Sequence, residues 1–233
     1  MEDKIKVFHG SENIIENPEL KKGKVNNDYG RGFYLSDDSE KGKEWACKNG
    51  KDGFLNEYLL DLSNLKVLNL LDEKYSILNW IAILLKNRHF DIDSEFSIAS
   101  KEYLLENFLI DTTDYDVVIG YRADDSYFSF ANGFISNTLS LNGLNKALRL
   151  GYLGTQIVLI SDKAINNLFF EKAEKVYKSI YYPKYCIRDE KARKEYLNSI
   201  KNINTAIDEL YMLDIMRGKI KNEDPRIQRI ISK

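Results

Sequence analysis

Two short stretches near the start of the chain combine glycines with a side chain suited to ligand binding. They are Val7-Phe8-His9-Gly10-Ser11 and Gly30-Arg31-Gly32-Phe33-Tyr34-Leu35-Ser36. Without a Cβ, a glycine lets the backbone turn tightly or approach a ligand closely. Side chains alternate along a strand, so a tyrosine between two core-facing residues faces away from that core. We therefore expect two neighbouring strands whose His9 and Tyr34 line one pocket.

Three further polar residues lie next to buried-strand signals and complete the set of candidates. Gln156 lies near the start of the apolar stretch 154–161, and Asp124 and Asp125 follow the stretch 116–121. Each candidate also has an ordinary structural explanation. A histidine at a strand end is often only hydrogen-bonded, a strand tyrosine often packs across strands, and paired aspartates often cap a turn. None of these residues taken alone predicts a function.

The sequence carries no widely shared catalytic motif. A phosphate-binding Gly-Lys-Ser/Thr loop is absent, and Gly30-x-Gly32 lacks the third glycine and the following helix of a dinucleotide-binding turn. Cys47 and Cys186 show no metal or redox spacing, and neither has a positioned histidine. A structural metal site and a thiol protease are therefore not expected.

Hydrophobic periodicity predicts a mixed set of strands and helices. A candidate N-cap at Asp37-Asp38-Ser39 opens one helix, Ser100 and Ser140 open two others, and Asp162 caps a last short one. Residues 13–27 are typical of a loop, and 128–135 favour a partly extended segment. Strands are expected at 5–8, 32–36, 54–62, 65–70, 116–121 and 154–161, and helices at 39–47, 72–88, 100–109, 140–150 and 162–170.

The length and the charge distribution suggest one domain with an appendage. A chain of 233 residues supports one medium domain plus a helical extension. Residues 1–170 hold 19 Lys and Arg against 26 Asp and Glu, a balance of −7, and residues 171–233 hold 15 against 10, a balance of +5. We place a boundary near residue 170, with a basic helical extension over 171–233. Its charge indicates either a solvated face or a docking surface.

The hydropathy pattern favours a cytoplasmic protein with no membrane partner. The N-terminal residues are charged and lack the apolar run of a signal peptide. The longest apolar run, residues 77–85, is too short to span a bilayer.

Taken in order, these stretches resemble the ADP-ribosyltransferase fold, in the histidine–tyrosine class shared by diphtheria-like toxins and poly(ADP-ribose) polymerases. More closely, the chain resembles an uncharacterised bacterial family, domain of unknown function 3990. The resemblance implies an α+β fold with a split β-sheet core, peripheral helices and a helical C-terminal extension. It spans roughly residues 5–170 and is carried by Val-Phe-His9-Gly10-Ser, by Gly-Arg-Gly-Phe-Tyr34-Leu-Ser with Trp45-Ala46 after it, and by Thr-Gln156-Ile-Val-Leu-Ile with Lys163-Ala164-Ile165 after it.

The resemblance also implies that NAD is the donor substrate and assigns roles to the motif residues. His9 would hold a ribose hydroxyl of the adenosine half, the Gly10 backbone would meet the nicotinamide carboxamide, and Tyr34 would stack on the nicotinamide ring. A tyrosine face attracts a positively charged ring by about 0.5–2 kcal/mol. Ser11 and Gly32 complete the donor-binding set.

The third signature position of the class is usually a glutamate, and here it reads Gln156. An amide can hydrogen-bond ribose hydroxyls, but it offers no full negative charge to an oxocarbenium-like transition state. Either Asp124 or Asp125 folds over the pocket and supplies the carboxylate, or the protein binds NAD and transfers slowly or not at all. We favour the first alternative.

The expected activity is transfer of ADP-ribose from NAD to a macromolecular acceptor, protein or nucleic acid, with release of nicotinamide and no need for a metal. The resemblance implies a bacterial toxin of a toxin–antitoxin or phage-defence system, with a neutralising antitoxin as partner. Two alternatives stay open: an NAD- or ADP-ribose-binding module without chemistry, and an NAD glycohydrolase in which water replaces the acceptor.

Overall fold

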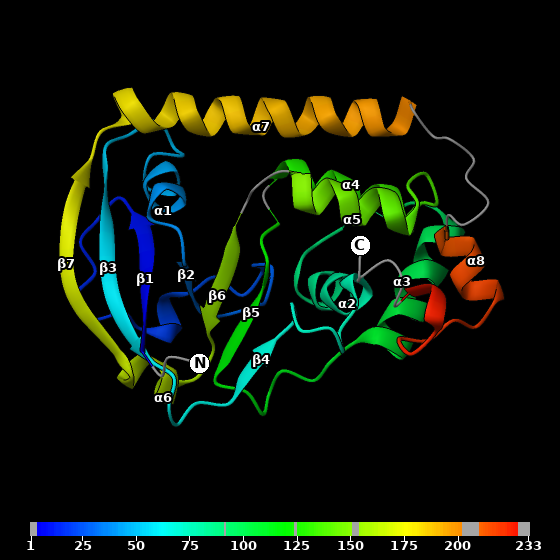
Figure 1. The fold of residues 1–233 in the computed structure, drawn as a ribbon, viewed down its shortest axis with the longest axis horizontal. Coiled ribbons are helices and arrows are strands. Elements are labelled where there is room, and N and C mark those ends of the chain that lie inside the picture. The colour runs from blue at the N-terminus through cyan, green and yellow to red at the C-terminus, as the bar shows by residue number, and fades with distance from the viewer. Residues whose placement is uncertain (1–3, 91, 124, 151–153, 202–209, 228–233) are drawn as a thin grey trace. The chain divides into compact units, whose positions relative to one another are not determined.

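The computed structural model describes residues 4–90, 92–123, 125–150, 154–201 and 210–227. The chain divides into two compact units, each built from three separate segments. Unit 1 combines residues 1–69, 111–122 and 153–189, and unit 2 combines residues 70–110, 123–152 and 190–233. The fold is a mixture of strands and helices, which confirms the expected α+β class at this coarse level (Figure 1).

Unit 1 is built on a seven-stranded sheet with the order β4-β5-β6-β2-β1-β3-β7. Only β4 and β5 pair in parallel, and every other neighbouring pair is antiparallel. The strands are β1 (Lys4–Ser11), β2 (Phe33–Ser36), β3 (Gly53–Asp61), β4 (Val67–Asn69), β5 (Val117–Tyr121), β6 (Thr155–Leu159) and β7 (Leu168–Val176).

The sheet is almost divided between β1 and β2. These two strands share a single register pair, Phe8 with Ser36, whereas β1 pairs with β3 along its whole length, Lys4–Ser11. The sheet therefore consists of one half with the order β4-β5-β6-β2 and another with the order β1-β3-β7. His9 is the first residue of β1 beyond the shared pair, so it lies where the two halves part.

Strand alternation gives the sheet two different faces. One face carries the main core of unit 1, which includes Val7, Leu35 and Tyr58, each no more than 1% exposed. The other face is covered in part by α1 (Ser39–Ala46), where Phe8 packs against a smaller cluster that contains Leu55. Asp38 caps α1 by accepting hydrogen bonds from the backbone of Glu40 and Lys41, so the predicted N-cap is confirmed.

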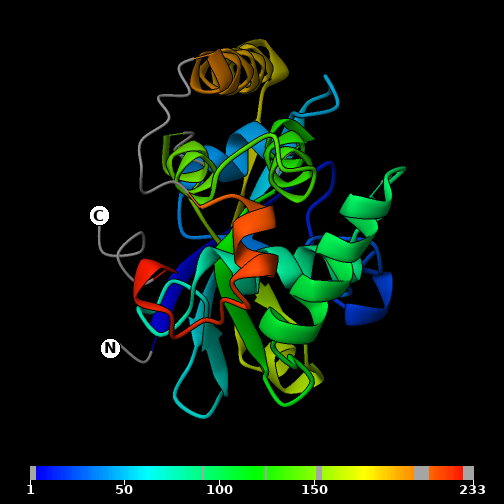
Figure 2. The same cartoon turned by 90° about the vertical axis from the view of Figure 1, so that its right-hand side faces the viewer.

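Unit 2 is helical in the residues described. Its helices are α2 (Ile77–Asn87), α3 (Glu95–Phe108), α4 (Asp125–Ile135), α5 (Leu141–Leu150) and α8 (Met212–Arg217). The orange-red α8 segment packs beside the green α3, where the Tyr103 hydroxyl donates to the Ile220 carbonyl at 3.1 Å (Figure 2). Unit 1 adds the short elements η1 (Leu20–Lys22) and α6 (Asp162–Asn166), and α7 (Lys178–Lys201) begins in unit 1 and ends in unit 2.

Two predictions about elements were wrong. Residues 128–135 belong to α4 rather than to an extended segment, because Phe130, Ala131 and Phe134 bury a stripe at helical spacing. The stretch 168–176 forms β7, although its Glu-Lys-Ala-Glu-Lys composition is typical of a helix. An edge strand with one open side tolerates such charges, and they discourage pairing with other chains. The boundary expected near residue 170 falls within this strand.

Two caps also differ from the predictions. Ser161 rather than Asp162 caps α6, and Ser94 rather than Ser100 caps α3. The hydroxyl of Ser100 instead donates to the Phe96 carbonyl within the helix. Residues 151–153, which follow the helix expected over 140–150, lie outside the described residues. None of the helices in the described ranges is long and apolar enough to cross a membrane.

Candidate functional site

The His9 imidazole is fixed at the point where β1 and β2 part. Its Nδ1 donates a hydrogen bond to the backbone carbonyl of Tyr34 at 2.7 Å. Its ring stacks on Phe33, with centroids 4.5 Å apart and planes 29° from parallel. The imidazole thus bridges a gap that backbone pairing leaves open.

The environment of His9 selects its neutral form. Burial lowers the pKa of the imidazole, the positive charge of Arg122 lowers it further, and the bond to the Tyr34 carbonyl opposes both effects. The net shift is downward. With Nδ1 protonated, Nε2 carries a lone pair and accepts hydrogen bonds. Among the described residues, no group donates to Nε2.

Asn56 of β3 holds the segment that follows His9. It is fully buried, and its Nδ2 lies 3.2 Å from the His9 carbonyl and 3.1 Å from Ser11 Oγ. Its Oδ1 accepts from the Ile15 backbone at 2.9 Å. Ser11 Oγ also donates to the Asn13 carbonyl, so this hydroxyl is engaged within its own loop. Sequence reasoning missed Asn56, although an amide inside the apolar run Phe54–Leu62 was a usable signal.

The Tyr34 phenol is anchored to the turn that precedes its own strand. Its hydroxyl donates to the Gly30 carbonyl at 2.6 Å and accepts from the Tyr29 backbone at 3.1 Å. Gly30 has φ of +78°, a conformation that suits glycine. Tyr29 in turn donates to the Tyr121 carbonyl at 2.6 Å, which ties this turn to β5. The oxygen of Tyr34 therefore sets the orientation of its ring.

Gln156 lies in β6 with a buried acceptor that has no donor. The residue is 6% exposed, and its Oε1 has no hydrogen-bond partner among the described residues. Gln156 pairs with Ser36 of β2 on one side and with Gly120 of β5 on the other. A buried, unsatisfied carbonyl oxygen costs about 1–3 kcal/mol, so Gln156 Oε1 needs a donor that the described residues do not supply.

The register shows which candidates share a face of the sheet. Directly paired residues point the same way, so Tyr34 and Gln156 lie on the face that Ser36 also occupies. Phe33 points to the opposite face, and the His9 ring stacks there. The structure thus brings Tyr34 and Gln156 to one face, whereas the His9 ring lies with Phe33 on the other face and contacts β2 through the Tyr34 carbonyl. The register therefore does not support the expectation that His9 and Tyr34 line one pocket.

Two predicted site glycines are required by close packing. A Cβ on Gly10 would lie 2.0 Å from the carbonyl oxygen of Gly42 in α1. A Cβ on Gly32 would lie 2.6 Å from Val158 of β6. Both distances are far shorter than Cβ contacts in real structures. Gly10 therefore lets β1 approach α1, and Gly32 lets the start of β2 approach β6. Close packing therefore explains why glycine stands at positions 10 and 32.

The predicted pair of aspartates is described only in part. Asp124 lies outside the described residues, and Asp125 is the first residue of α4, in unit 2. The expectation that Asp124 or Asp125 supplies the carboxylate that Gln156 lacks stays a prediction.

Comparison with known proteins identifies the family of the chain. A family model described as a protein of unknown function (DUF3990) matches residues 5–170. The chain belongs to the DUF3990 family. No curated protein and no solved structure matches it.

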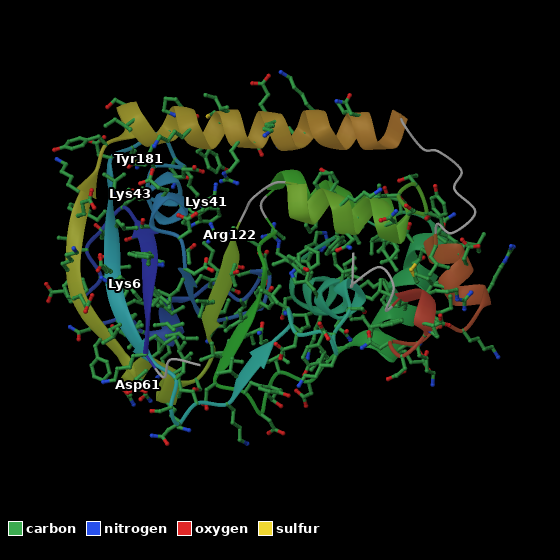
Figure 3. The ribbon with its side chains drawn as sticks, in the orientation of Figure 1. Lys6, Lys41, Lys43, Asp61, Arg122 and Tyr181 are labelled. Carbon is green, nitrogen blue, oxygen red and sulfur yellow. The ribbon has the colours of Figure 1, made fainter. Side chains whose placement is uncertain are left out.

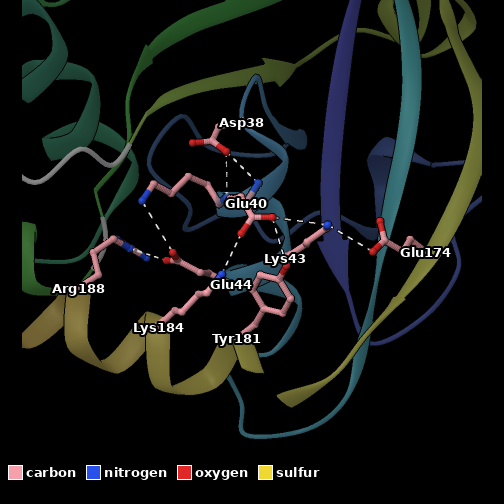
Figure 4. Close-up of polar contacts among 9 residues, drawn as sticks. Asp38, Glu40, Lys43, Glu44, Glu174, Tyr181, Lys184 and Arg188 are labelled. Atoms are coloured by element: carbon pink, nitrogen blue, oxygen red, sulfur yellow. Dashed lines mark hydrogen bonds and ion pairs between the residues drawn. The ribbon is translucent and has the colours of Figure 1, made fainter. Parts of the chain in front are cut away.

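In this DUF3990 protein, the matched region ends inside β7. Residues of α7, which follow β7, contact α1. Arg188 donates to Glu44 at 2.6 Å, and both side chains are about nine-tenths buried (Figure 4). Glu40 accepts from the Tyr181 hydroxyl at 3.1 Å and from Lys184 at 3.0 Å. The start of α7 therefore fixes α1, the helix against which Gly10 packs. Sequence reasoning treated these residues as a separate extension.

Proposed function

We propose that this DUF3990 protein binds NAD at the junction of β1 and β2 and transfers its ADP-ribose group to a macromolecular acceptor. One observation carries the proposal: two acceptor atoms without donors, His9 Nε2 and Gln156 Oε1, flank the strand that holds Tyr34. Sugar hydroxyls are donors of the kind that these atoms need. The order of the three motifs, which resembles the histidine–tyrosine class of ADP-ribosyltransferases, supports the same assignment.

The proposed chemistry needs positioning more than a reactive side chain. The bond between the ribose C1′ and the nicotinamide nitrogen breaks, and nicotinamide leaves with the bonding electron pair as a neutral molecule. A nucleophilic atom of the acceptor bonds to C1′ and loses its proton. The anchored Tyr34 ring would hold the cationic nicotinamide by its face, and Gln156 would orient the adjoining ribose. Asp124 or Asp125 would supply the negative charge that Gln156 lacks.

Gln156 itself favours a second candidate function, recognition of NAD or ADP-ribose without transfer. A neutral amide satisfies sugar hydroxyls as well as a carboxylate does, yet it stabilises a developing positive charge far less. A binding module would keep His9 and Gln156 and would need no carboxylate.

The experiment that separates these functions uses the full chain with NAD labelled in the adenosine half and a cell lysate. Label on a macromolecule supports the transferase, and digestion with nuclease or protease then identifies its class. Free ADP-ribose without labelled macromolecule indicates a glycohydrolase. Tight binding of NAD without release of nicotinamide indicates the binding module. No binding of NAD at millimolar concentration would reject all three.

Variants then test the residue roles. Replacing Asp124 and Asp125 by Asn, singly and together, should abolish turnover of NAD, and turnover by the double variant would remove these aspartates from the mechanism. Gln156→Ala should raise the KM for NAD, because the ribose loses its acceptor. Lys4→Gln, at the far end of β1, is the control and should leave the turnover of NAD and its KM unchanged.

A further inference from the structure

The strand β7 leaves one edge of the unit 1 sheet open. It comes last in the strand order, beside β3, and Figure 1 shows it at the outer edge of the sheet. Among the residues that the structure describes, no other strand and no backbone hydrogen bond from a loop joins its outer side. Residues Leu168–Val176 therefore offer an outer row of N–H and C=O groups to which a further strand can add.

The order of charges along β7 makes the strand complementary to itself. Lys172 and Glu174 flank Ala173, and Glu171 and Lys175 come next on either side. When two copies pair antiparallel about Ala173, Lys172 of each copy lies opposite Glu174 of the other. A parallel pairing in register would set like charges opposite one another. The charges that discourage pairing with other chains therefore favour a second copy in one antiparallel register.

Lys172 and Glu174 are both available at this edge. They are two residues apart in the strand, so their side chains point to the same face of the sheet. The Lys172 side chain is 69% exposed, and that of Glu174 is 58% exposed. An ammonium has three donors and a carboxylate has several acceptor sites, so each group can take a partner from a second copy besides its partner within the chain.

Ion pairs of alternating sign already cross the sheet toward β7. Lys6 of β1 lies 2.5 Å from one oxygen of Glu57 in β3, and the other oxygen lies 3.6 Å from Lys172. Lys43 of α1 lies 3.3 Å from Glu174, and Figure 3 labels both Lys6 and Lys43 beside these strands. In the antiparallel register, Glu174 of a second copy continues this alternation beyond Lys172.

Exposed aromatic side chains lie at both ends of the charged stretch. Phe169 is 52% exposed and Tyr177 is 50% exposed. Antiparallel pairing about Ala173 brings the start of one β7 beside the end of the other, so Phe169 of each copy lies near Tyr177 of the other. The bulge at Glu171 shifts this meeting by one residue at most. Contact between the two rings removes apolar surface from water at each end.

We propose that two copies of this chain pair along the open edge of β7, antiparallel and centred on Ala173, and so join their sheets into one. The contact is small, so the dimer is weak and forms as concentration rises. Its exposed ion pairs fix the register more than they add affinity. The inference goes beyond the proposed function and stands or falls independently of NAD, because it involves neither His9 nor Gln156.

Sedimentation velocity of the full chain from about 1 μM to about 1 mM tests whether the dimer forms. The wild type should change reversibly from monomer to dimer within this range. Amide hydrogen exchange in residues 168–176 should become slower at the high concentration, because the outer N–H groups then have partners. A wild type that stays monomeric overturns the proposal, as does a dimer in which exchange of the β7 amides is unchanged.

Two charge reversals test the register. Lys172→Glu and Glu174→Lys each set like charges opposite one another at two places, so each should weaken the homodimer about tenfold or more. An equimolar mixture of the two variants should form a heterodimer, because each lysine then faces a glutamate again. The chain with both substitutions should recover the homodimer for the same reason.

Recovery decides the matter, because each single reversal also removes an ion pair within its own chain. Lys21→Glu makes the same change of charge on an exposed residue of η1 and should leave the dimer unchanged. Homodimers of both single variants as tight as that of the wild type overturn the proposed pairing. A mixture that associates no more tightly than either variant alone overturns it as well.

Discussion

His9 owes its chemical state to its burial and to two neighbours, Tyr34 and Arg122, that are distant in the chain. Burial and the charge of Arg122 oppose protonation, and the Tyr34 carbonyl fixes the tautomer. The sequence identified the histidine and its glycine but could not indicate whether the ring is neutral. That state decides which of its nitrogens can accept a bond from a sugar hydroxyl.

The lowered pKa of His9 predicts a dependence of stability on pH. Above the ordinary pKa of 6.5, His9 is neutral in the folded and the unfolded chain. As pH falls from there, the unfolded chain takes up the proton first, so stability falls until the folded pKa is passed. The thermal midpoint of the wild type should fall more between pH 7 and pH 5.5 than that of His9→Asn. Equal falls in the two proteins would contradict the buried, neutral imidazole.

Gln156 predicts opposite effects on stability and on binding. Gln156→Leu removes a buried oxygen that has no donor and keeps a similar volume, so the free energy of unfolding should stay the same or rise by about 1 kcal/mol. Binding of NAD should weaken about tenfold, because a ribose hydroxyl then loses its acceptor. Chemical denaturation and calorimetry measure the two quantities. A variant that is less stable and binds NAD normally would show that Gln156 has only a structural role.

At the scale of elements, the segment from His9 to Ile15 depends on one amide in β3. Asn56→Ala removes the bonds to His9, Ser11 and Ile15, and we expect it to lower the free energy of unfolding by about 2–4 kcal/mol. Amide hydrogen exchange should also become faster over residues 9–15. Asn56→Asp keeps the acceptor and loses the donors, which separates the two contributions. Unchanged exchange in both variants would contradict the proposal that Asn56 holds the segment from His9 to Ile15.

The link between α1 and α7 rests mainly on the buried pair of Glu44 and Arg188. Arg188→Met removes the shortest ion pair of the buried Glu44 carboxylate, and we expect a loss of about 3–5 kcal/mol, of which Glu44→Gln in the same chain should recover part. Lys184→Ala breaks an exposed pair with Glu40 and should change stability little. Urea denaturation of the wild type, Arg188→Met, Glu44→Gln and the double variant measures the coupling, and Lys184→Ala is the exposed comparison. Additive effects of the two core substitutions would contradict a direct pair.

At the scale of the molecule, the family match and the folded unit do not end at the same residue. The match ends at residue 170, whereas β3 from Gly53 to Glu57 pairs with residues 172–176 of β7. Unit 1 runs on to residue 189, and unit 2 takes up the rest of the chain. The basic character of residues 171–233 therefore belongs to segments that complete both units.

A chain that ends at residue 170 should fail to fold stably. It lacks residues 171–176 of β7, which include the buried Val176 that packs in the cluster with Leu55, and it lacks the α7 residues that hold α1. We expect a broad thermal transition or none by circular dichroism, and loss of NAD binding. A chain that ends at residue 227 retains all described elements and serves as the control. A cooperative transition of the shorter chain near that of the control would show that residues 1–170 fold by themselves.

Local patterns determined much of the fold of unit 1. Short apolar stretches predicted β1, β2, β3, β5 and β6 within a few residues, because strands that are buried on one or both faces need such residues. The cap at Asp38 was also local information. Glycine next to a polar ring marked both strands of the candidate site, since such a backbone suits close approach.

Only the tertiary structure decided how those residues are used. It showed that Gly10 and Gly32 are needed for packing, that Asn56 holds the His9 segment and that β7 continues the sheet beyond residue 170. It also showed that Arg122 lies over Trp45 and bears on the charge of His9. These contacts join residues that are between 32 positions (Gly10 and Gly42) and 126 positions (Gly32 and Val158) apart in the chain. Composition and periodicity carry no information on such contacts, because burial, register and charge proximity exist only once the strands have paired.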